Sequence, residues 1–162
     1  MAGKLRKVIS GGQTGVDQGA LAAAHKLNIP FSGWAPFGFR CENGRIPRIY
    51  SEKMNESESM SYPLRTKRNV HWADATIIYC HDLANSPGTQ LTIKICKKEG
   101  RPWIDMITET NMFVRNEDGY QRMVELLAGY EVINVAGTRE STFPGIFEAS
   151  KARLIEVFKR LI

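Results

Sequence analysis

The sequence has no long hydrophobic run, and its apolar stretches are far too short to cross a bilayer. The first residues, Met1–Lys7, are basic and lack the apolar core of a secretory signal peptide. Cysteine is scarce, and Cys41, Cys80 and Cys96 do not have the paired spacing of disulfide frameworks or zinc sites. These absences predict a cytoplasmic protein with no membrane span and no structural metal.

Common catalytic signatures are also absent. The glycines near the N-terminus are not followed by lysine and a hydroxyl residue as in a P-loop, and neither Gly-x-Gly-x-x-Gly nor Gly-x-Ser-x-Gly occurs. The histidines, His25, His71 and His81, have no metal-binding partner four residues away. The sequence therefore identifies no catalytic residue.

The net charge of +5 raises the question of nucleic acid. Basic residues are spread along the chain with acidic residues among them, as in Lys97-Lys98-Glu99. Nucleic-acid binders instead concentrate basic residues on one element beside aromatic platforms. A nucleic-acid-binding module is therefore the weakest interpretation, and no nucleic-acid partner is predicted. The excess positive charge fits an ordinary surface together with a preference for a small anionic ligand.

Strands and helices alternate along the 162 residues, a length that suits a single domain, 1–162. The predicted strands are 7–10, 30–34, 75–80, 101–107 and 131–135. The predicted helices are 14–27, 64–72, 86–98, 118–127 and 145–161. Residues 35–62 form a long irregular stretch, in which the polar segment 52–61 is predicted to be a mobile flap. This alternation is typical of an α/β fold, Rossmann-like and doubly wound, with a mainly parallel sheet and helices on both faces.

The most informative segment is the turn between the first strand and the first helix, which reads Gly11-Gly12-Gln13-Thr14-Gly15. A strand, a glycine turn and a helix leave backbone N–H groups unpaired at the positive end of the helix dipole. Such a turn binds anions, so these five residues are candidates for ligand binding. The structural alternative is a βα turn in which glycine only permits a positive φ.

Asp17 lies in the first turn of the predicted helix and has two interpretations. An acidic side chain there interacts favourably with the helix dipole, which is a purely structural role. Beside a bound phosphate, however, a carboxylate would be repelled. If the turn binds a ligand, Asp17 is expected to accept hydrogen bonds from hydroxyls or ring N–H groups, such as those of a ribose or a pterin.

Two further segments follow strands at the same edge of the predicted sheet, where ligands bind in doubly wound folds. Gly88 and Thr89 begin a helix, and Gly137, Arg139 and Ser141 follow the last strand. Ordinary helix-start chemistry is the alternative for the first pair. Arg139 can hold a phosphate or carboxylate, or it can form a surface ion pair with a neighbouring acid.

Four residues outside these turns complete the candidate site. Trp34 can stack on a flat heterocycle, although an aromatic side chain beside a strand end is more often part of the core. Arg40 can reach an anion. Arg65 and Asn69 lie four residues apart on one face of a helix, which suits polar ligand contacts or a solvated basic face.

Together these blocks resemble the molybdenum-carrier family, a branch of the Rossmann-type superfamily that includes the cytokinin-activating phosphoribohydrolases and lysine-decarboxylase-like proteins. The matching blocks cover nearly the whole chain in order: Ile9–Asp17, Gly33-Trp34, Arg65-Thr66-x-x-Asn69-Val70, Gly88-Thr89-x-x-Thr92, Asn134–Ser141 and Pro144-Gly145-Ile146. The resemblance implies a phosphorylated ligand, either molybdenum cofactor, which is a pterin bearing a phosphate, or a nucleotide. It places ten residues in the pocket: Gly11, Gly12, Thr14, Gly15, Asp17, Gly88, Thr89, Gly137, Arg139 and Ser141.

The chain departs from these relatives at three positions. Gln18 replaces an arginine that is common in the family, and Pro87 replaces a glycine and so removes an N–H donor. Phosphoribohydrolases have a glutamate where this chain has Thr92. We therefore predict a ligand-binding protein first, with a nucleotide phosphoribohydrolase or a sensor of nucleotide-derived ligands as the alternative. Related folds often pair through helices, so a homodimer is expected.

Overall fold

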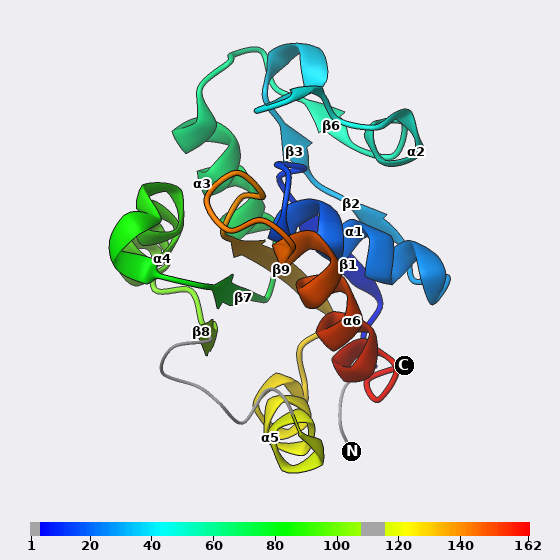
Figure 1. The fold of residues 1–162 in the computed structure, drawn as a ribbon. Helices are drawn as coiled ribbons and strands as arrows, with labels where there is room; N and C mark the ends of the chain where they lie inside the picture. The colour runs from blue at the N-terminus through cyan, green and yellow to red at the C-terminus, as the bar shows by residue number, and fades with distance from the viewer. Residues whose placement is uncertain (1–3, 108–115) are drawn as a thin grey trace.

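The computed structural model describes residues 4–107 and 116–162. Its centre is a five-stranded sheet in the order β2–β1–β9–β7–β8, in which every neighbouring pair is parallel (Figure 1). The strands are β1 (Lys7–Ser10), β2 (Phe31–Ser32), β7 (Ala75–Cys80), β8 (Trp103–Ile107) and β9 (Val132–Gly137). The main helices are α1 (Val16–Lys26), α3 (Tyr62–Trp72), α4 (Pro87–Glu99), α5 (Glu117–Leu127) and α6 (Ile146–Phe158). The predicted α/β class with a parallel sheet is confirmed.

Both faces of the sheet are covered by helices. Helices α3 and α4 lie beside each other, and α1 packs on α6, away from that pair (Figure 1). Every residue of β7 is buried, as its continuous apolar run requires in a sheet covered on two sides. Helix α1 approaches α6 closely at Gly19, where a Cβ would overlap with the Ser150 hydroxyl. Glycine at position 19 therefore allows α1 and α6 to pack closely.

The strand order shows how the chain is wound. The last strand, β9, lies in the middle of the sheet between β1 and β7. If β9 and α6 were moved to the front of the chain, the strand order would read 3-2-1-4-5, as in a Rossmann-type sheet. In that order the winding reverses between the first and fourth strands, which here are β9 and β7. A crevice for ligands is expected above the carboxyl ends of these two strands.

The predicted strand 30–34 is wrong in its second half. Only Phe31–Ser32 pairs with β1, and Gly33 then turns the chain at a φ of +147°, where a Cβ would overlap with the carbonyl of Ser10. The chain continues into a second, small sheet of β3 (Trp34–Ala35) and β6 (Asn55–Glu56). Glycine at this position therefore lets β2 leave the central sheet.

The region predicted to be irregular contains several short elements. These are β4 (Arg40–Cys41) and β5 (Gly44–Arg45), which form a hairpin, the short helix α2 (Arg48–Ser51) and a 3-10 turn (Phe37–Phe39). The segment predicted to be a free flap is held by the pairing of β6 and by the buried side chains of Met54 and Ser57. No helix among the described residues is both long and apolar enough to span a membrane.

Candidate functional site

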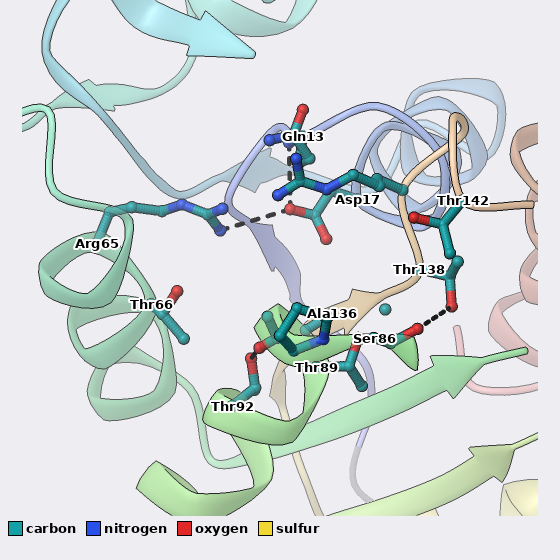
Figure 2. A pocket seen from close by; sticks show the side chains of 14 residues that line it. Gln13, Asp17, Arg65, Thr66, Ser86, Thr89, Thr92, Ala136, Thr138 and Thr142 are labelled. Carbon is teal, nitrogen blue, oxygen red and sulfur yellow. Dashed lines mark hydrogen bonds and ion pairs between the residues drawn. The ribbon is translucent and has the colours of Figure 1, made fainter. Parts of the chain in front are cut away.

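A cavity of about 320 Å³ opens above the carboxyl ends of β9 and β7, where the winding of the sheet reverses. Figure 2 shows Asp17 and Arg65 on one side of it and Ser86, Thr89 and Thr92 on the other. Seven of the residues predicted from the sequence line this cavity: Gln13, Asp17, Arg65, Gly88, Thr89, Gly137 and Arg139. The fold thus brings together residues from four separate segments of the chain.

Asp17 is a buried carboxylate on the wall of the cavity. Its Oδ2 accepts a hydrogen bond from the backbone N–H of Gln13 at 3.1 Å and lies 3.5 Å from Nη1 of Arg65. Its Oδ1 has no hydrogen bond within the described residues and points into the cavity (Figure 2). Burial raises the pKa of Asp17 from 3.8 to about 6, although the charge of Arg65 and the hydrogen bond from Gln13 lower it in part.

Arg65 comes from α3 and is also nearly buried, with 12% of its side chain exposed. Its guanidinium lies against the backbone of Gly11, where any Cβ would overlap with Nη1. The buried Nε has no hydrogen-bond acceptor within the described residues. Burial lowers the pKa of Arg65, but a guanidinium stays protonated in proteins. The cavity therefore contains a fixed positive charge that lacks a full set of acceptors.

The N-terminus of α4 forms the opposite wall. The hydroxyl of Ser86 donates to the carbonyl of Asp82 at 3.0 Å, so the side chain does not cap the helix. Pro87 has no N–H, and the N–H groups of Gly88 and Thr89 have no acceptor within the described residues. No atom lies within 4 Å of the place that a Cβ of Gly88 would occupy. Two N–H groups at the positive end of a 13-residue helix, in residues that line the cavity, thus have no acceptor within the described chain.

Arg139, which follows β9, connects the cavity to a residue that the sequence did not indicate. Its Nη1 lies 3.7 Å from Oε2 of Glu42, in the β4–β5 hairpin. Glu42 also accepts hydrogen bonds from the N–H and hydroxyl of Ser141, at 3.1 and 2.6 Å, and from the hydroxyl of Thr14. Partial burial raises the pKa of Glu42, but these hydrogen bonds and Arg139 outweigh it, so the pKa is lowered. No motif surrounds Glu42, so only the tertiary structure identifies it.

The glycine turn after β1 differs from the prediction. Three of its N–H groups and that of Val16, the first residue of α1, are already bonded within the protein: Gly12 to the Ser10 hydroxyl (3.3 Å), Gln13 to Asp17 (3.1 Å), Thr14 to the Gln13 side chain (3.1 Å) and Val16 to the Thr138 carbonyl (3.1 Å). The expectation of unpaired N–H groups is therefore wrong for these four residues. The turn positions Asp17 and Gln13 instead of offering a row of free donors.

The remaining predicted residues lie elsewhere. Thr14, Gly15 and Ser141 line a second, more open hollow of about 540 Å³. Five others line neither hollow: Gly11, Gly12, Trp34, Arg40 and Asn69. Asn69 is buried and holds the backbone of Trp34 through two hydrogen bonds, of 2.7 and 3.0 Å. The Trp34 ring lies against Arg68, whose guanidinium carbon is 4.6 Å from the ring centroid. The structure gives Asn69 a role in holding the segment that contains Trp34.

Several hydroxyl groups on the cavity wall were not predicted as ligand contacts: Thr66, Ser86, Thr92, Thr138 and Thr142. The hydroxyl of Thr92 donates to the carbonyl of Gly88 at 3.0 Å and so is committed to its own helix. Most of these residues lie within the same segments as the predicted glycines, so their hydroxyl groups could have been read from the sequence. Their orientation could not, because it depends on how the strands are ordered.

The chain resembles known proteins along most of its length. Residues 8–158 match the model of the circularly permutated YpsA SLOG family. This chain belongs to that family. The permutation in the family's name agrees with the central place of the last strand, since moving β9 and α6 to the front restores the Rossmann-type order.

A crystal structure similar to this SLOG-family chain is that of a "putative molybdenum carrier protein" from Syntrophus aciditrophicus SB. The two sequences are 31% identical, the TM-score is 0.83, and the match covers 98% of this chain and 97% of the other. No curated protein matches the chain.

Proposed function

We propose that this SLOG-family chain is a single-domain carrier that binds one phosphorylated heterocyclic molecule, molybdenum cofactor or a nucleotide. The observation that supports this most directly is the N-terminus of α4, where Gly88 and Thr89 line the cavity and their N–H groups have no acceptor in the described chain. A helix N-terminus of this kind suits a phosphate group. A volume of about 320 Å³ lies at the lower end of small-molecule pockets, so it suits one mononucleotide-sized ligand.

Charge favours one orientation of such a ligand. Ionised Asp17 would repel a phosphate group, whereas the positive end of the α4 dipole, together with Arg139, would attract it. The phosphate would therefore bind at Gly88 and Thr89, and the ring would lie toward Asp17. Thr66, Thr138 and Thr142 also line the cavity, and the hydroxyls of Thr66 and Thr138, which donate to backbone carbonyls, can still accept hydrogen bonds from a ligand.

The choice of molybdenum cofactor as cargo starts from the similar protein from Syntrophus aciditrophicus, whose name describes a molybdenum carrier. The cavity fits the organic part of that molecule, because free N–H groups and hydroxyls suit its phosphate and a carboxylate suits the N–H groups of a pterin. Among the described residues, no group of three His, Cys, Asp or Glu side chains is arranged to hold a metal ion. In this proposal the chain therefore contacts the phosphate and the ring of the cofactor.

A phosphoribohydrolase is the second candidate, and Asp17 is the observation that favours it. Asp17 is the one carboxylate that lines the described part of the cavity, and burial raises its pKa to about 6, a value suited to a general acid near neutral pH. Thr92 provides no carboxylate beside the phosphate site. Release of free base from a nucleoside monophosphate by the wild type, and its loss in Asp17→Asn, would establish this activity.

Native mass spectrometry of gently purified protein tests the carrier function, followed by release and identification of the bound molecule. We expect a phosphorylated pterin or nucleotide in the wild type. Gly88→Asp should abolish binding, because it places a negative charge at the proposed phosphate site in a position with open space. Gly88→Ala, which adds a side chain without charge, and Gln121→Glu, which adds the same charge on the exposed face of α5, should keep the ligand. Retention of the ligand by Gly88→Asp would refute the phosphate site.

The homodimer and the cytoplasmic location expected from the sequence stay predictions.

A further inference from the structure

We infer that the cavity selects rings with a 2-amino-4-oxopyrimidine edge, which guanine and pterins share. In this edge a ring N–H lies between a carbonyl oxygen and an amino group. The inference rests on the proposed function and names the class of ring that the phosphorylated ligand has. The observation behind it is the pair of oppositely charged side chains, Asp17 and Arg65, side by side on one wall of the cavity (Figure 2).

Asp17 requires hydrogen-bond donors from the ligand. Its Oδ2 is already occupied by the Gln13 N–H and by Arg65, whereas Oδ1 points into the cavity with no hydrogen bond from a described residue. An ionised carboxylate has about four lone-pair positions, so about half of its capacity to accept hydrogen bonds, that of Oδ1, remains unused. Because the residue is 4% exposed, bulk water cannot fully replace these missing bonds. A ligand that presents one or two N–H donors here would satisfy the carboxylate.

Arg65 requires an acceptor at the neighbouring position. Its guanidinium has five N–H donors, and its contact with Asp17 is an ion pair at 3.5 Å, longer than a good charge-assisted hydrogen bond. The backbone of Gly11 and the ring of Tyr62, whose centroid is 5.3 Å from the guanidinium carbon, lie against it. A planar group held in this way offers donors in a fixed direction. A carbonyl oxygen of the ligand is the natural complement.

The two groups together therefore present a donor beside an acceptor. A 2-amino-4-oxopyrimidine edge offers the reverse pattern, with the carbonyl toward Arg65 and the N–H groups toward Asp17. Adenine has no carbonyl oxygen and offers the carboxylate a single amino group. A ribose offers hydroxyls that can act as donors or acceptors, but the hydroxyl-lined space beside α4 suits a sugar better, because it adjoins the proposed phosphate site.

Calorimetric titration with a series of monophosphates tests this selection in the wild-type protein at one pH. The series consists of GMP, IMP, AMP and the monophosphate of 6-hydroxymethylpterin, each in competition with inorganic phosphate. We expect GMP and the pterin phosphate to bind at least about tenfold more tightly than AMP, since each adds hydrogen bonds to a charged group. IMP, which lacks the amino group, should bind with intermediate affinity. The ratio of the affinities for GMP and for the pterin phosphate shows whether the cavity prefers a guanine nucleotide or a pterin.

Asp17→Asn supplies the matched variant. Its affinity for GMP should fall about tenfold or more, while its affinity for AMP changes by less than about threefold. Asp118→Asn, on the exposed side of α5, removes the same charge and should change neither affinity. If Asp17→Asn does not fold, the ligand series in the wild type still decides, because it requires no variant.

The outcomes separate this inference from the proposed function. If AMP binds as tightly as GMP while inorganic phosphate competes with both, the phosphate site stands and the selection of the ring edge is refuted. The selection is also refuted if only one of GMP and the pterin phosphate exceeds AMP, because the two share the edge. If no monophosphate binds and phosphate has no effect, the proposed function itself is refuted.

Discussion

Two turns at the same edge of the sheet use glycine in opposite ways. The turn after β1 contains three glycines, Gly11, Gly12 and Gly15, yet its N–H groups at positions 12, 13, 14 and 16 are bonded within the protein. The turn after β7 contains one glycine and a proline, yet it leaves two N–H groups of α4 open to the cavity. A cluster of glycines therefore marks close packing here, and the sparser turn provides the free donors.

The physical reason is what each glycine touches. A Cβ at Gly15 would overlap with the carbonyl of Thr138, and one at Gly11 would overlap with Arg65. A Cβ at Gly88 would meet no atom within 4 Å. Substitutions at these three positions can therefore separate packing from ligand binding.

The largest effect is expected at Gly15. Its φ is +80°, and an added Cβ would overlap with backbone atoms that cannot move aside easily. Gly15→Ala should lower the free energy of unfolding by about 3 kcal/mol or more. Urea unfolding followed by circular dichroism measures this change. A loss of unfolding free energy below about 1 kcal/mol would show that the turn after β1 tolerates a side chain at this position, which would contradict the contrast with the turn after β7.

Asp17 should make the stability depend on pH. Since burial raises its pKa from 3.8 to about 6, the folded state holds a proton between these values that the unfolded state has lost. The contribution of Asp17 to stability therefore falls as the pH rises from about 4 to about 6. A rise of the pKa from 3.8 to about 6 corresponds to roughly 3 kcal/mol.

Thermal unfolding of the wild type and of Asp17→Asn across this pH range measures the effect. The stability of Asp17→Asn relative to the wild type should increase by about 3 kcal/mol between pH 4 and pH 7. For Asp118→Asn, on the exposed side of α5, the difference from the wild type should be small and nearly constant with pH. A constant difference for Asp17→Asn as well would mean that its carboxyl titrates normally.

A smaller effect is expected at Gly11, because the atom it would meet is the end of a flexible side chain. Gly11→Ala should displace the guanidinium of Arg65 at a cost of about 1–2 kcal/mol. Without that positive charge, which lowers the pKa of Asp17, the pKa should rise above its wild-type value. NMR titration of the Asp17 carboxyl carbon would detect the rise. An unchanged pKa would show that Arg65 keeps its position.

The smallest effect is expected at Gly88. Gly88→Ala adds a methyl group in open space near the start of α4, where alanine favours the helix more than glycine does. The free energy of unfolding should change by less than about 1 kcal/mol, toward greater stability. Chemical unfolding of Gly88→Ala and Gly15→Ala under the same conditions compares the two turns directly. A strong destabilisation by Gly88→Ala would show that the turn after β7 has no open space at this position.

Much of the site could be predicted because its residues lie in recognisable segments. Gly88 and Thr89 follow β7 and Gly137 ends β9, and parallel strands bring their carboxyl ends to one edge. Glu42 could not be predicted, because it lies in an irregular region and reaches Ser141, 99 residues away. Asn69 was predicted as a ligand contact, but its amide is used by the backbone of Trp34, 35 residues away.

The sequence by itself determined the alternation of strands and helices and the parallel α/β class, because periodicity and turn signals act over a few residues. Only the tertiary structure decided that β9 lies between β1 and β7, and so where the cavity forms. It also decided which donors stay free. A backbone N–H is free or bonded according to the acceptors that packing brings near it, and at this site several acceptors come from distant parts of the chain.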